Sequence, residues 1–208
     1  MNLIKFKNKK LIIFSIIILV LFIIVFYYWW EDTRKITPPE KWETAKISEK
    51  GDYKIIKENI DGKVIENEKM GLSYIIPKYW ISKKEDLTTF YSPDANFKEN
   101  SSVLLERGCK INIYSSYIKT DIESLKNYND REIKMSPLIE LDEFLEIRVS
   151  NYPALKYSFH TNKLEMSYVG VSIPVKNKLY NIKLSSSIKE IERCKEEFNN
   201  FLQTISIK

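Results

Sequence analysis

The stretch that decides the fold is Val169-Gly170-Val171-Ser172-Ile173-Pro174-Val175, which the turn Lys176-Asn177-Lys178 joins to Leu179-Tyr180-Asn181-Ile182-Lys183-Leu184. In both runs, apolar residues recur at every second position. A period of two places these side chains on one face of an extended chain. The short turn between the runs predicts an antiparallel hairpin with one face in a core.

Shorter alternating runs precede this hairpin along the chain. Ile60-Asp61-Gly62-Lys63 predicts a tight turn, because Asp-Gly tolerates a positive φ. Residues 97–108 are expected to form a polar loop. The further predicted strands cover residues 53–56, 64–65, 71–77, 87–91, 109–114, 145–149 and 155–159.

Two capping-box patterns predict helices. Thr120-Asp121-Ile122-Glu123 begins a short helix, and residues 136–144 are expected to add one or two helical turns. Ser187-Ile188-Lys189-Glu190 begins a closing helix. Strands and long helices do not alternate regularly, so the expected fold class is α+β, an antiparallel β-sheet domain packed with helices. The apolar stripe of the closing helix is Ile188, Ile191, Cys194, Phe198, Phe201 and Leu202.

A long apolar segment near the N-terminus predicts a membrane anchor. Of the twenty residues from Leu11 to Trp30, all but Ser15 are apolar or aromatic. Twenty helical residues span about 30 Å, the thickness of a hydrocarbon core. A cleaved signal peptide would end in small residues, whereas this segment ends in Phe26 and four aromatic residues. The segment therefore predicts an uncleaved transmembrane helix rather than a signal peptide or a buried core helix.

The flanking charges predict the orientation of this helix. Residues 1–10 contain four lysines, whereas Glu31 and Asp32 follow the apolar segment. Because positively charged flanks stay on the cytoplasmic side, the N-terminus is expected to be cytoplasmic. Tyr27, Tyr28, Trp29 and Trp30 are expected to form an aromatic belt at the outer interface. The expected organisation at the cell membrane is a cytoplasmic basic tail (1–10), a transmembrane signal anchor (11–30), a stalk or linker (31–50) and an extracytoplasmic α+β domain (51–208).

The net charge excludes one class of partner. The chain carries a net charge of +5, of which +4 lies in residues 1–35. Residues 36–208 are therefore nearly neutral and lack the basic surface that nucleic-acid binding requires. No nucleic-acid partner is expected.

Two parts of the chain resemble the PsbP family of α/β domains. Gly71-Leu72-Ser73-Tyr74-Ile75-Ile76-Pro77-Lys78-Tyr79-Trp80 is similar to that family's opening, in which a strand ends at a proline and a tryptophan tucks under the sheet. The second part runs from Tyr152 through two strands to the helix that ends at Leu202. The family usually has glycine where this chain has Tyr79 and Tyr152. The resemblance covers residues 64–208 and implies an α/β/α sandwich. It also implies that this protein is a membrane-anchored, bacterial-type member of the family with an accessory, non-enzymatic role.

Few residues are candidates for chemistry. His160 is the single histidine and no Gly-x-Ser-x-Gly turn accompanies it, so a surface or turn position is expected. The spacing of the acidic cluster matches no calcium loop and predicts a solvated face, although whether the cluster binds a cation stays open. No catalytic residue, metal site or cofactor is predicted. The acidic cluster is Glu140, Asp142, Glu143 and Glu146. A series of aromatic residues is expected in the core, or alternatively in a ligand groove. These residues are Tyr74, Tyr79, Trp80, Phe90 and Tyr91.

Cys109 and Cys194 are the only cysteines, and both lie in the part expected outside the cytoplasm, where disulfides persist. Cys109 belongs to the apolar face of a predicted strand and Cys194 to the apolar stripe of the closing helix. A helix that packs on a sheet can bring two such positions together, so we expect a disulfide. The alternatives are two separate buried thiols, or thiols on opposite faces of the sheet.

These features predict a single-pass, membrane-anchored, extracytoplasmic accessory or binding protein without catalytic activity. Its expected partners are the lipid bilayer, through residues 11–30, and other envelope or membrane proteins. The alternative is a membrane-tethered hydrolase of an envelope polymer that uses Asp or Glu residues. A cleft with two facing carboxylates of raised pKa would favour the hydrolase.

Overall fold

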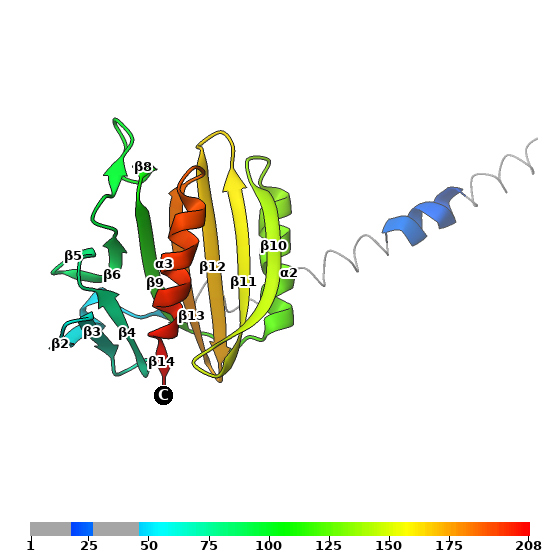
Figure 1. Cartoon of the computed structure of the whole chain (residues 1–208). Coiled ribbons are helices and arrows are strands. Elements are labelled where there is room, and N and C mark those ends of the chain that lie inside the picture. The colour runs from blue at the N-terminus through cyan, green and yellow to red at the C-terminus, as the bar shows by residue number, and fades with distance from the viewer. Residues whose placement is uncertain (1–17, 27–45) are drawn as a thin grey trace, which may run out of the picture. The chain divides into compact units, whose positions relative to one another are not determined.

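The larger of two main sheets is antiparallel throughout, with the strand order β10-β11-β12-β13-β9-β6-β5 and β1 added beside β9 (Figure 1). The computed structural model describes residues 18–26 and 46–208. The alternating runs of the sequence account for the long central strands. The strands of this sheet are β1 (Lys46–Ile47), β5 (Ile81–Lys83), β6 (Asp86–Tyr91), β9 (Cys109–Tyr117), β10 (Glu140–Val149), β11 (Tyr152–Thr161), β12 (Met166–Val175) and β13 (Lys178–Ser187).

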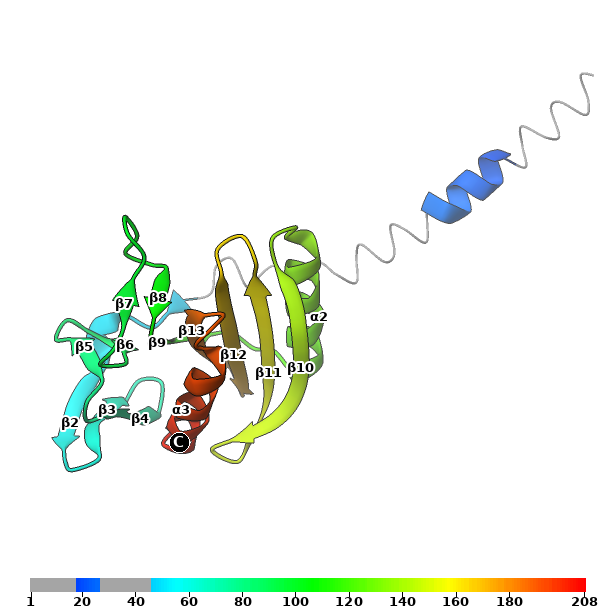
Figure 2. The same cartoon turned by 45° about the horizontal axis from the view of Figure 1, so that its top comes forward.

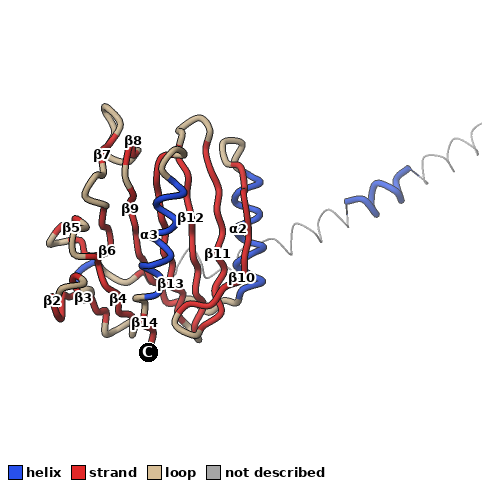
Figure 3. The backbone as a smooth tube through the Cα atoms, in the orientation of Figure 1, coloured by secondary structure: helices blue, strands red, loops and turns tan. Residues whose placement is uncertain are grey.

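A smaller four-stranded sheet lies beside the larger one and has the order β14-β4-β3-β2 (Figure 3). The C-terminal strand β14 pairs with β4, so the last residues of the domain close this sheet. A separate ladder joins β7 to β8. The elements are η1 (Lys50–Asp52), β2 (Lys54–Glu58), β3 (Gly62–Asn67), β4 (Leu72–Pro77), β7 (Asn96–Phe97), β8 (Leu105–Arg107) and β14 (Ser206–Ile207).

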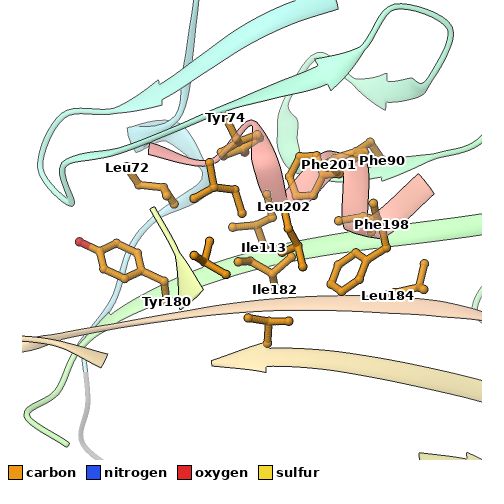
Figure 4. Close-up of a cluster of buried hydrophobic side chains, with 14 of the residues drawn as sticks. Leu72, Tyr74, Phe90, Ile113, Tyr180, Ile182, Leu184, Phe198, Phe201 and Leu202 are labelled. Atoms are coloured by element: carbon orange, nitrogen blue, oxygen red, sulfur yellow. The ribbon is translucent and has the colours of Figure 1, made fainter. Parts of the chain in front are cut away.

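Helix α3 (Ile191–Gln203) lies between the two sheets and forms the main core with them (Figure 4). Phe201 packs beside Phe90 of β6, and Phe198 lies near Leu184 of β13. The helix buries one continuous stripe, as its sequence predicts. The buried residues of this stripe are Ile191, Cys194, Phe198, Phe201 and Leu202.

Helix α2 (Ile122–Met135) lies beside β10 and β11 and packs on the opposite face of the larger sheet (Figure 2). Its core is small, because only Leu125 and Ile133 of the helix are buried. Leu125 meets Leu155 and Leu179 of the sheet in this second core. Helices on both faces of an antiparallel sheet confirm the expected α+β class.

The strands predicted from alternation are confirmed, and so is the turn before Gly62, where φ is +147°. Three boundaries differ from the predictions. Residues 97–108 are not only a polar loop, because Phe97 pairs with the buried Leu105. The cap of α2 is Asp121, whose carboxylate accepts from the backbone N–H of Ser124. Helix α3 begins at Ile191, so the 187–190 pattern precedes the helix as a turn and Ile188 is 37% exposed.

The predicted helical turn at 136–144 is wrong over most of its length. Residues 140–149 form β10, which pairs with β11 from Glu140 opposite His160 to Val149 opposite Tyr152. A strand that pairs along its whole length satisfies its backbone groups by long-range bonds, which outweigh a weak local helical preference. The folded domain also begins earlier than residue 51, since Lys46 and Ile47 pair with β9.

The predicted membrane anchor falls mostly outside the described residues. Residues 18–26 are helical and expose all their apolar side chains, whereas Leu11 and the aromatic belt Tyr27, Tyr28, Trp29 and Trp30 are not among the residues that the structure describes. Across the described ranges, no helix combines the length and apolar character needed to cross a membrane.

Candidate functional site

Cys109 and Cys194 form a disulfide, as predicted. Cys109 begins β9 and Cys194 lies in the first turns of α3, with Cα atoms 5.6 Å apart. Both residues are fully buried. The bond attaches α3 covalently to the face of the larger sheet across 85 residues of sequence.

His160 lies between two carboxylates at the β10 edge of the larger sheet. Its Nδ1 is 2.7 Å from an oxygen of Asp142, and its Nε2 is 3.3 Å from an oxygen of Glu140. Asp142 occupies the irregularity in the register between β10 and β11, while Glu143 and Glu146 are exposed on the same strand. No group of three or more acidic, histidine or cysteine side chains in residues 18–26 and 46–208 could hold a metal ion.

The carboxyl groups with a clear pKa shift do not show the pattern of an acid catalyst. The Ser92 hydroxyl lowers the pKa of Asp94, and the Lys98 ammonium lowers the pKa of Glu165. In the described part of the chain, every Asp or Glu with a clear pKa shift is shifted downward. A general acid needs the opposite shift. The hydrolase alternative therefore gains no support from these groups.

The aromatic series at 74–91 does not form a groove. Tyr74, Trp80 and Phe90 are buried in the main core, where the Trp80 and Phe90 rings meet edge to face at 5.6 Å. Tyr79 is exposed, and Tyr91 lies on the other face of the sheet beside Phe97. Three of the five residues are therefore core residues, as expected.

A cavity of about 250 Å³ lies between α2 and the sheet face opposite α3. Helix α2 lines it with Leu125, Tyr128 and Asn129. Its rim is open to solvent, since Ile47 is 60% and Tyr114 41% exposed. Aliphatic and hydroxyl-bearing residues complete the wall, and none of the lining side chains is charged.

Two asparagines supply unused polar groups to this cavity. Asn181 is 8% exposed and its Oδ1 accepts a hydrogen bond of 2.7 Å from Ser172. Its Nδ2 has no hydrogen-bond partner within the described residues. Asn129 donates from Nδ2 to the carbonyl of Leu125 at 2.9 Å, which leaves its Oδ1 as an acceptor. The Asn181 donor is not among the fully buried, unpaired side-chain atoms of the described residues, so it is reached from the open cavity and is available to a ligand.

Tyr157 forms one wall because the strand beside it has no side chain at Gly170. Tyr157 pairs with Gly170 across β11 and β12, and its ring lies over that glycine. A Cβ at position 170 would lie 2.2 Å from Cζ of the ring. Burial raises the pKa of the Tyr157 phenol well above its ordinary value, so the hydroxyl remains a hydrogen-bond donor at neutral pH.

Replacing Gly170 by alanine is expected to destabilise the domain by about 1–3 kcal/mol, because the new methyl group displaces the Tyr157 ring. Thermal unfolding of the full chain measures the loss. Gly51→Ala is the matched control, since nothing lies within 4 Å of a Cβ at that position. Equal melting temperatures for the two variants would show that Tyr157 does not rest on Gly170.

An aromatic ladder continues from the cavity along the same face. The rings of Tyr157 and Phe159 stack at 6.4 Å, and those of Phe159 and Tyr168 at 4.8 Å. The Lys183 ammonium lies 4.4 Å from the Tyr168 ring centroid. Burial lowers the pKa of Lys183, and the Lys110 cation lowers it further. Neither lysine forms an ion pair with a carboxylate in the described ranges.

The sequence did not indicate a binding site on this face of the sheet. Asn181 and Lys183 occupy the polar positions of an alternating strand, which a sequence assigns to solvent. One residue could have indicated the site, because Asn129 is polar and lies one helical turn after the buried Leu125 on α2.

These features define an α+β domain with helices on both faces of an antiparallel sheet and a neutral, tyrosine-lined cavity under one helix. No family model and no curated protein matches the chain. Among solved structures, cyanobacterial PsbP from Synechocystis is 16% identical, covers 67% of this chain and 88% of its own, and has a TM-score of 0.45. LpqN, described as involved in cell envelope biogenesis of Mycobacterium tuberculosis, is 11% identical over 80% of this chain and 94% of its own, with a TM-score of 0.46.

A protein of unknown function from Pseudomonas aeruginosa is 14% identical, covers 64% of this chain and 88% of its own, and has a TM-score of 0.45. A PsbP structure is thus among the matching structures, and its resemblance to this chain is weak.

Proposed function

We propose that the chain is a membrane-anchored, extracytoplasmic accessory protein that binds a partner or ligand and catalyses no reaction. The observation that carries this proposal is the Cys109–Cys194 disulfide, which uses both cysteines of the chain. Structural disulfides form and persist outside the reducing cytoplasm. The apolar segment 11–30 and the lysines before it supply the anchor and its orientation.

The non-catalytic part of the proposal rests on the side chains at the surface. His160 is paired with carboxylates at an exposed sheet edge, and among the described residues no nucleophile is hydrogen-bonded to it. The tyrosine-lined cavity contains amides and hydroxyls but no acid or base. Such a lining suits binding better than proton transfer.

A reporter that is active only outside the cytoplasm is expected to be active when fused after Lys208. The four lysines at 5, 7, 9 and 10 retain the N-terminus in the cytoplasm, so the domain is translocated. Enzymatic activity of the fusion in intact cells measures the result. A variant with these lysines replaced by glutamine is the control and should lower the translocated fraction. Protection of the domain from added protease in protoplasts would contradict the proposed location.

The proposed partner is another envelope or membrane protein. Crosslinking of the full chain in intact cells, followed by mass spectrometry, identifies proteins held near the domain. A variant with Lys50 and Lys63 replaced by arginine keeps the charge while removing two amines, which shows whether capture depends on the amines at these two positions. Recovery of cytoplasmic proteins alone would contradict the proposal.

A further inference from the structure

We propose that the cavity beneath α2 binds a hydroxylated six-membered ring that carries one negatively charged group, as in a uronic acid or a sugar phosphate. The ring occupies the neutral cavity, and its charged group lies against Lys183. This inference names the ligand class of the proposed binding role and rests on that role.

The size and charge of the cavity limit the ring. A volume of about 250 Å³ is below the roughly 300–1,000 Å³ of pockets for drug-sized molecules, so it accommodates a single ring. A charged ring would lose its hydration without gaining a counterion, because the lining has no charged side chain. The ring itself is therefore neutral.

The polar groups of the cavity call for hydroxyls. Asn181 offers a donor and Asn129 an acceptor, and the Tyr157 phenol can act as either. A hydroxyl group also donates and accepts, so several hydroxyls on one ring can satisfy this mixed set. A purely apolar ring would leave the buried Asn181 amide unpaired. The ring faces of the tyrosines provide apolar surface for the C–H face of a sugar.

The sheet register places Lys183 next to this cavity. Asn181 lies opposite Ser172 and Tyr114, which are cavity residues. Two residues further along, on the same face, Lys183 lies opposite Gly170, and Gly170 lies opposite Tyr157. Residues two apart on one strand are separated by about 7 Å. Lys183 does not line the cavity, and its ammonium extends over the Tyr168 and Phe159 rings, so the charged substituent has to extend past the Tyr157 ring to meet it.

Lys183 has the surroundings of an anion-binding cation. Its ammonium lies over the rings of Tyr168 and Phe159 at 4.4 and 5.4 Å, and no carboxylate of the described residues neutralises it. A second lysine, Lys110, lies close enough to repel it. A carboxylate or phosphate would relieve both the desolvation and the repulsion, and would form a charge-assisted hydrogen bond.

Saturation-transfer NMR with the full chain in a sugar-free detergent tests the inference. The probes are glucuronate, glucose 6-phosphate and glucose, which share one ring and differ in charge. Both anionic probes are expected to bind about tenfold more tightly than glucose. Lys183→Gln should abolish this difference, whereas Asn181→Ala should weaken all three probes about five- to tenfold. A preference between the two anionic probes identifies the charged group.

Matched variants exclude indirect effects. Asn96→Ala removes an amide that bonds to Glu106 on the separate β7–β8 ladder, and should leave binding unchanged. Lys156→Gln removes a lysine that bonds to Asn199 beside α3, and should also have no effect. Asn129→Leu fills the cavity and improves helix propensity, so it should raise the melting temperature while abolishing binding.

Three results would overturn the inference. In the first, no probe shows saturation transfer. In the second, glucose and the anionic probes bind with equal affinity. In the third, the Asn181→Ala variant binds the probes as tightly as the wild type does. The reporter fusion after Lys208 is independent of any ligand. A translocated domain that binds none of the sugars would refute this inference and leave the proposed location and anchoring intact.

Discussion

Replacing both Cys109 and Cys194 by alanine is expected to lower the free energy of unfolding by about 4.5 kcal/mol. The cysteines are 85 residues apart, and a crosslink across so long a loop strongly restricts the unfolded chain. Because domains are stable by only about 5–15 kcal/mol, the loss is a large fraction of the total. Thermal unfolding should show a decrease in Tm of about 10–15 °C.

The reduced wild-type protein is the control for this variant. Dithiothreitol should lower the Tm of the wild type toward that of the alanine variant, and should leave the alanine variant unchanged. If reduction and substitution both left the Tm unaltered, the bond would contribute nothing to stability. Two thiols in the protein isolated from cells, alkylated only after denaturation, would contradict the disulfide itself.

Phe201→Ala is expected to destabilise the domain by about 3–5 kcal/mol. Phe201 is 1% exposed, and its ring meets Phe90 at 5.2 Å and Tyr74 at 5.9 Å. These two residues belong to different sheets, so the phenyl ring fills the space between β6 and β4. Alanine would leave a cavity there, since neither sheet can collapse without moving the other.

Glu196→Ala on the same helix is the matched control. Glu196 is exposed, so its loss should change stability by less than about 0.5 kcal/mol. Chemical denaturation of both variants measures the difference, with equal slopes expected because the fold is retained. A Phe201→Ala midpoint equal to that of Glu196→Ala would mean that α3 does not hold the two sheets together.

Regular repeats of apolar residues predicted the strands and the helix that each bury one face in the core. Alternation at 169–175 and 179–184 became β12 and β13, and the stripe from Ile191 to Leu202 became the buried face of α3. Cys109 and Cys194 each lay on such a buried face, so their disulfide was predictable as well. These elements could be predicted because a strand or helix that is buried on one side has a regular repeat of apolar residues. This repeat is visible within a short stretch of sequence.

The predictions failed where distant residues determine the local structure. Residues 140–144 read as helical but pair with β11, and the 187–190 pattern precedes α3 because Ile188 remains in the turn after β13. The pairing of β14 with β4 also joins the end of the chain to a strand more than a hundred residues away. Backbone bonds of this kind leave no local pattern in the sequence.

The sequence by itself determined the alternating strands, the apolar stripe of α3 and the apolar segment 11–30 from which an anchor is predicted, and it placed both cysteines on buried faces. Only the tertiary structure decided that Asn181 and Lys183 lie beside Tyr157 rather than in open solvent. The reason is that a strand has the same alternating sequence whether its polar face is exposed to solvent or covered by a helix. Helix α2 covers that face incompletely, and the space it leaves is the candidate site.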